Sequence, residues 1–109
     1  MIQDPIKFFE GSAKVPIRLT IREGPGRLDL TGATVKLIIN KEAEGTAVSG
    51  SPFDAVVTDA ANGVVTYTTT GTESFNVANI YKGQLKVTFP SGKIIFTEIF
   101  RIIVQKHLV

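Results

Sequence analysis

The stretch RLDLTGATV, residues 27–35, joins a turn directly to a strand and decides the fold. Four of its residues make up the predicted structural turn: Asp29, Leu30, Thr31 and Gly32. The aspartate carboxylate can cap the turn, the leucine can plug the end of a sandwich, and the glycine supplies a permissive backbone. We therefore expect this stretch to be a corner of the scaffold and not a site of chemistry.

Outside this corner, apolar and polar residues alternate, which is the pattern of strands with one buried face. The alternation is cleanest over residues 81–89. Turn residues such as Asn62-Gly63 and Pro90-Ser91-Gly92 separate the strands, because Asn and Gly tolerate a positive φ and Pro fixes φ. The sequence predicts seven strands, at residues 6–10, 15–22, 35–39, 53–58, 64–70, 81–89 and 93–105. A helical turn fits only residues 72–78.

Seven short strands with such turns are typical of a Greek-key sandwich or a small barrel. Tyr81 favours the sandwich, since immunoglobulin-like folds often place a corner tyrosine at the start of the sixth strand. Gly83 stands two residues further on, where antibody domains have their second cysteine. The alternative for Tyr81 is a plain core aromatic. The predicted fold class is all-β, an immunoglobulin-like Greek-key β-sandwich of about seven strands.

Composition restricts the classes of function. The chain has 109 residues, so we expect a single β-sandwich domain over residues 1–109. Its lack of cysteine excludes disulfides and thiol chemistry. The net charge of +2 is too weak, and the basic residues too scattered, to predict a nucleic-acid partner. No apolar run approaches the ~20 residues that span a bilayer, so no membrane partner is expected.

No constellation of residues predicts catalysis. The lone histidine, His107, lies close to the end of the sequence, where a solvated tail is expected. No serine has another histidine to activate it. The Asp-x-Asp-x-Asp spacing of a calcium loop does not occur. We predict no enzyme activity, no catalytic or metal-binding residue, and no cofactor.

The last predicted strand carries the candidate interface. Both of its faces are apolar, and a two-layer fold covers only one of them. Glu98 also falls on the face of Phe96 and Phe100, where an unpaired charge would be costly. A β-bulge near Thr97 and Glu98 would rotate the strand and remove that conflict. The functional alternative is that the outward residues contact another protein, either a second copy or a different partner. The candidate interface residues are Ile95, Ile99, Arg101 and Ile103.

Two other binding classes compete with this interpretation. An OB-like barrel that binds single-stranded nucleic acid needs exposed aromatics among basic residues. The aromatics are instead expected in the core, because they lie on apolar faces or among aliphatic residues: Phe53, Tyr81, Phe89, Phe96 and Phe100. A carbohydrate- or surface-binding module, the alternative function, needs aromatics around a shallow groove. The absence of Trp and the presence of two Tyr count against it.

The order of these signals between residues 12 and 105 resembles one family. Strand 15–22 is followed by LDLTGATV at residues 28–35 and then by DAANGVVTY at residues 59–67. YKG at residues 81–83 comes next, and GK at residues 92–93 leads into the last apolar strand. This order resembles the N-terminal immunoglobulin-like domain of siphophage baseplate upper proteins.

The resemblance implies a structural role in a phage particle. The expected function is a non-enzymatic virion module that docks onto phage tail or baseplate proteins, with a homo-oligomer as a further possibility. Synthesis and assembly in the host cytoplasm agree with the lack of cysteine and of a leader. The sequence stops at Val109 without the region that follows in the family layout. We expect either a piece of a longer protein or a small stand-alone virion protein.

Overall fold

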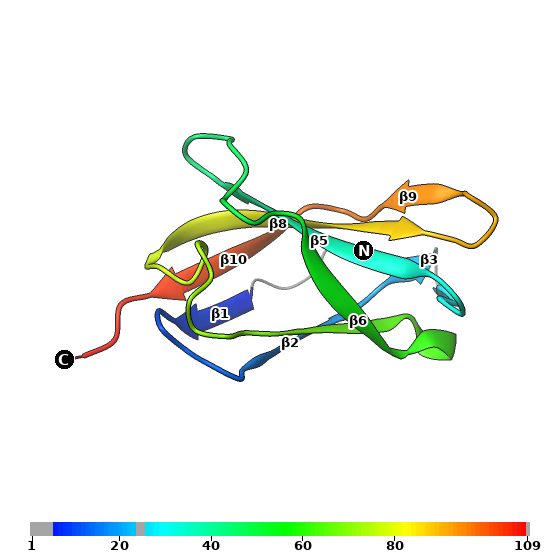
Figure 1. Ribbon diagram of the computed structural model, residues 1–109, viewed down its shortest axis with the longest axis horizontal. Coiled ribbons are helices and arrows are strands. Elements are labelled where there is room, and N and C mark those ends of the chain that lie inside the picture. Colours follow the sequence, from blue (N-terminus) through cyan, green and yellow to red (C-terminus); the bar gives the residue numbers. More distant parts are fainter. Residues whose placement is uncertain (1–5, 24–25, 109) are drawn as a thin grey trace.

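A computed structural model of the chain describes residues 6–23 and 26–108 and shows a two-layered β-sandwich (Figure 1). The first layer is built from five strands: β1 (Ile6–Phe9), β5 (Thr34–Lys41), β8 (Asn79–Thr88), β9 (Ile94–Phe96) and β10 (Phe100–Gln105). The second layer contains β2 (Pro16–Thr20) and β7 (Val64–Thr68). β6 (Phe53–Asp59) contributes to both layers.

The strand order is that of an immunoglobulin-like sandwich. The first half of β6 pairs with β5, and its second half pairs with β7, so this strand crosses from one layer to the other (Figure 1). The hydrogen-bonded order is β1-β10-β8-β5-β6-β7-β2, with β9 also on β8. β2, β7 and β6 correspond to immunoglobulin strands B, E and D, and β5, β8 and β10 to C, F and G. The predicted fold class is confirmed.

All seven predicted strands are present, the last of them in two pieces, β9 and β10. A short ribbon is added by β3 (Arg22–Glu23) and β4 (Gly26–Arg27). The helical turn expected at residues 72–78 is wrong, because this segment is a loop with a turn closed by the amide of Asn76 and the carbonyl of Glu73, 2.9 Å apart. A 3-10 helix, η1 (Ala60–Asn62), lies in the connection between β6 and β7.

The inward side chains of both layers form one core around an aromatic cluster. Phe75, from the loop between β7 and β8, is fully buried at its centre. Its ring centroid lies 5.0 Å from that of Phe53 and 5.9 Å from that of Tyr67. Burying one such side chain contributes about 1.5–3 kcal/mol. This cluster therefore ties a loop that lacks regular structure firmly to the sandwich.

Phe96 does not join the core, so this part of the expectation is wrong. Its side chain is 57% exposed, whereas Phe100 is buried. In β9 it is Ile95 that packs against the core, and strand alternation therefore sends Phe96 outward. Phe53 and Phe89 do pack against the core as expected.

Candidate functional site

The predicted structural turn connects β4 to β5. The Asp29 carboxylate accepts hydrogen bonds from the hydroxyl (2.7 Å) and the amide (3.0 Å) of Thr31, and these bonds lower the pKa of Asp29. Leu30 is fully buried, and its amide donates to a carbonyl oxygen of η1 2.8 Å away. Gly32 has a φ of +75°, and a Cβ there would lie 2.9 Å from Cγ of Pro90. The contacts of this turn are contacts within the scaffold.

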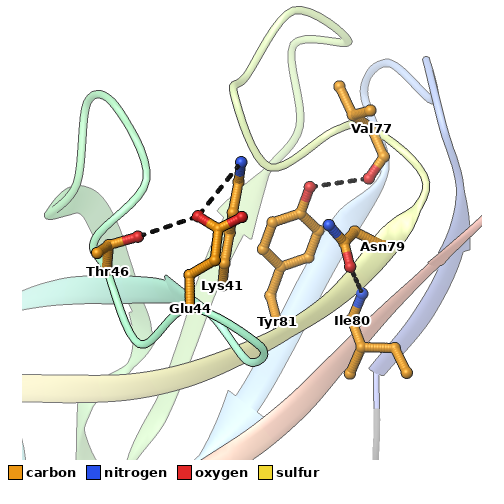
Figure 2. Close-up of polar contacts among 7 residues, drawn as sticks. All are labelled: Lys41, Glu44, Thr46, Val77, Asn79, Ile80 and Tyr81. Carbon is orange, nitrogen blue, oxygen red and sulfur yellow. Dashed lines mark hydrogen bonds and ion pairs between the residues drawn. The ribbon is translucent and has the colours of Figure 1, made fainter.

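Tyr81 forms the corner that its position predicts. The side chain is buried, and its hydroxyl donates to the carbonyl oxygen of Val77, 2.9 Å away and four residues upstream (Figure 2). Burial raises the pKa of Tyr81. The bond holds the loop before β8 against the start of that strand, as in the tyrosine corner of immunoglobulin-like domains. The corner role of Tyr81 is confirmed.

Gly83 leaves room for a neighbouring ring. A Cβ at this position would lie 2.5 and 2.7 Å from two ring atoms of Phe100 and 3.2 Å from a side-chain atom of Ile102. The ring of Phe100 therefore takes up the space beside the position where antibody domains carry their second cysteine. In this chain, Gly83 allows the Phe100 ring of the neighbouring strand β10 to pack directly over the β8 backbone.

A polar network that the sequence reasoning missed is centred on Glu73. Its carboxylate accepts hydrogen bonds from the Tyr67 hydroxyl (2.7 Å), the Thr70 amide (2.8 Å), the Gly71 amide (3.0 Å) and the Asn76 side-chain amide (3.1 Å). Burial raises the pKa of Glu73, but these hydrogen bonds outweigh it and hold the pKa at about 2. The run TTGTE at residues 69–73, a carboxylate just after turn residues, is the signal that could have revealed it.

The network continues to the connection between β1 and β2. The Asn76 side chain donates to the carbonyl of Ser12 (2.9 Å) and accepts from the amide of Gly11 (2.8 Å). The Thr69 hydroxyl also donates to Ser12 (2.8 Å). Strongly shifted pKa values often mark functional sites. In this network the lowered pKa of Glu73 arises from hydrogen bonds within residues 67–76, while Asn76 and Thr69 bond this segment to the β1–β2 connection.

The last strand is interrupted by a β-bulge. Residues 97–99 lie opposite only two residues of β8, 84 and 85, so the chain carries one extra residue here. The Thr97 amide donates to the Leu85 carbonyl and its hydroxyl accepts from the Leu85 amide, each at 3.0 Å. The bulge predicted near Thr97 and Glu98 is confirmed.

The bulge divides the four candidate interface residues. Ile99, Arg101 and Ile103 alternate with buried residues of β10, and Ile99 is 57% exposed. Arg101 forms an ion pair with Glu42 at 2.8 Å. Ile95 precedes the bulge and packs against the core instead. The structure thus places three of the four residues in one outward series and separates Ile95 from them.

Ile95 faces a cleft between the two layers. This cleft has a volume of about 260 Å³ and opens between two strands that pair on one side only in the described part of the chain, β2 and β9. Leu19 and Ile21 line one wall, and Ile95 and Phe100 line the other. Arg22 and Glu98 also contribute to the lining. The sequence did not reveal this cleft, because its walls come from distant segments.

The described residues hold no cluster of side chains suited to a metal ion. Across residues 6–23 and 26–108, no three His, Asp or Glu side chains come close enough together to hold a metal ion. Within the same ranges, no helix is both long and apolar enough to cross a membrane. The His107 ring contacts the carbonyl of the adjacent Leu108 at 2.8 Å.

The sequence and the fold of this chain were compared with those of known proteins, and the comparisons identify its family. No curated protein has a significantly similar sequence. Among solved structures, that of murine CRIg is similar to this chain. The alignment covers 97% of this chain and 96% of the CRIg chain, with a TM-score of 0.44 and 14% sequence identity. The family model of the BppU N-terminal domain, a domain of phage baseplate upper proteins, matches residues 1–109. The predicted resemblance is thereby confirmed, and the chain belongs to the BppU N-terminal domain family.

Proposed function

We propose that this chain is a non-enzymatic structural module of a phage baseplate, a single domain over residues 1–109 that docks onto tail or baseplate proteins. The observation that carries this proposal is the family match across the whole sequence. A baseplate protein is a component of the virion, and we propose that this one is made and assembled in the host cytoplasm. The lack of cysteine is consistent with a reducing compartment.

Three groups with shifted pKa values support a structural role. Glu73 and Tyr67 are bonded to each other at 2.7 Å, and the Asp29 carboxylate is bonded to Thr31. Burial and the neighbouring Glu73 raise the pKa of Tyr67 well above its usual value. A catalytic group needs a pKa near the working pH. The pKa values of Glu73 and Tyr67 are instead shifted further from pH 7, the first downward and the second upward.

The proposed docking surface follows the last strand and consists of Ile99, Arg101 and Ile103. Ile99 is a large apolar side chain that is more than half exposed, and such side chains are favoured in interfaces. Arg101 is held in one orientation by Glu42. Ile103 is half-buried and lies directly opposite the exposed Ile80 of β8. Ile95 enters the proposal only through the cleft that it lines.

Incorporation into virions tests this surface. Ile99→Ser is compared with Val77→Ser, because the two parent side chains are 57% and 56% exposed and Val77 lies in the loop before β8. We expect Ile99→Ser to lower the amount of the protein in purified particles at least fivefold, and Val77→Ser to leave it unchanged. Both variants should melt close to the parent. Normal incorporation of Ile99→Ser would reject the surface, and absence of the parent protein from virions would reject the proposed function.

Light scattering on the purified chain at high concentration identifies the kind of partner. A dimer that Ile99→Ser converts to a monomer would assign the surface to a second copy. A monomer would remove self-association and leave docking onto other baseplate proteins.

A further inference from the structure

The outer face of the first layer collects an unusual share of the basic residues. Five of the twelve Lys and Arg residues alternate there with inward neighbours on their own strands: Lys7, Lys36, Lys82, Lys86 and Arg101. By contrast, β2, β6 and β7 contain a single basic residue, Arg18. The cations are therefore gathered on one face and are not spread evenly for solubility.

Several of these cations lie directly opposite one another. The register places Lys86 opposite Lys36 across β8 and β5, and Lys82 opposite Arg101 across β8 and β10. Like charges in such positions destabilise a sheet. Ion pairs offset part of this repulsion, because Asp54 pairs with Lys36 and Glu42 pairs with Arg101. A protein that retains opposed cations gives up some stability for them.

Three cations of this face stay uncompensated. Among the described residues, Lys7, Lys82 and Lys86 form no ion pair. Two of them lie beside apolar side chains of this face: Lys7 lies opposite Ile103, which also lies opposite the exposed Ile80, and Lys86 lies opposite the exposed Phe96. An apolar centre surrounded by a polar rim is the usual make-up of a protein interface. The same isoleucines would gain nothing from a phosphate backbone or a lipid headgroup.

We infer that the outer face of β1, β10, β8 and β5 docks an acidic surface of another baseplate protein. This inference rests on the proposed function and deepens it by assigning the charge of the partner. Carboxylates of the partner pair with Lys82 and Lys86 and relieve the repulsion within the sheet, while Ile80 and Ile103 supply apolar contact. Such complementarity mainly sets specificity and the rate of association.

Charge reversal at matched positions tests the inference. Lys82→Glu and Lys86→Glu are compared with Arg18→Glu, which makes the same change of charge on the second layer. In virions of the phage that encodes the chain, we expect each lysine variant to be incorporated at least tenfold less than the parent, and Arg18→Glu to match the parent. Lys82→Glu should melt at the same or a higher temperature, because it places an anion opposite Arg101. Loss of incorporation without loss of stability separates docking from misfolding.

The same virion measurement can also contradict the inference. Parental incorporation of both lysine variants, or an equal loss with Arg18→Glu, would overturn the inference. If Ile99→Ser still blocks incorporation in that case, the proposed function stands and only the charge assignment fails. Binding of the parent to a 20-nucleotide single-stranded DNA or to phosphatidylglycerol vesicles is measured in parallel. If the lysine variants lose that binding while entering virions normally, the face is reassigned to nucleic acid or membrane.

Discussion

Tyr81 and Val77 are joined by a hydrogen bond in which the phenolic hydroxyl donates to the backbone carbonyl oxygen, 2.9 Å away. Tyr81→Phe keeps the buried ring but removes the donor. We expect the free energy of unfolding to fall by about 0.5–1.5 kcal/mol, the net contribution of a typical hydrogen bond. Urea denaturation measures it, with the slope against denaturant unchanged. Unaltered stability would mean that ring packing alone holds the corner.

Gly83→Ala forces a methyl group against the ring of Phe100. Because a Cβ would lie 2.5 Å from the nearest ring atom, the ring must move, and we expect a loss of about 1–3 kcal/mol. In a Phe100→Leu background the same substitution should cost less. A double-mutant cycle measures the coupling, which we expect to be at least ~0.5 kcal/mol. Strictly additive effects would show that the two positions do not share this space.

Thr97→Val removes the hydroxyl that accepts the Leu85 amide at 3.0 Å. The strand amide then lacks its acceptor at the bulge, and we expect the unfolding free energy to fall by about 1–2 kcal/mol. Thr97→Ser keeps the hydroxyl and is the matched control. Thermal melts of the two variants should therefore differ, with the valine variant melting several degrees lower. Equal melting temperatures would show that the hydroxyl does not support the bulge.

The Glu73 carboxylate makes the free energy of unfolding depend on pH in the acid range. Its pKa is lowered from 4.5 to about 2 in the folded chain, so its contribution is complete above pH 4.5 and is lost as the pH falls toward 2. Glu73→Gln cannot lose a charge, so its unfolding free energy should decline less steeply over that range. At pH 7 we expect this variant to be less stable by about 1–2 kcal/mol. Parallel pH profiles for the parent and the variant would contradict the role of this carboxylate.

Strand alternation made much of the fold predictable. β5 and β8 each present one face to the core, so their apolar residues recur at every second position. Tyr81 was predictable because a corner tyrosine has a fixed place at the start of its strand. The bulge was predictable because, without it, the charge of Glu98 would fall on an apolar face of the last strand. The side of the bulge on which the alternation would reverse was not predictable. Ile95 was therefore expected to face outward and Phe96 inward, whereas Ile95 packs against the core and Phe96 is exposed.

Other features depend on contacts between distant segments. Phe75 lies in a loop without periodicity, and the packing of Phe8, Phe53 and Tyr67 around it explains its burial. Glu73 acquires its role from amides that a turn directs toward it. The crossing of β6 between layers leaves no mark in its alternation, because its inward side chains stay inward on both sides. The cationic face likewise appears only once the register brings Lys36 and Lys86 together.

The parallel pairing of β1 with β10 determines how the fold carries mechanical load. The two strands lie side by side from Ile6 opposite Ile102 to Phe9 opposite Gln105 and run in the same direction. A pull on the chain before β1 and after β10 therefore acts along both strands in opposite senses. Their hydrogen bonds are strained together in shear and cannot open one at a time. A pull between the two ends of the sandwich is therefore resisted along the strand direction, by the whole β1–β10 pairing at once.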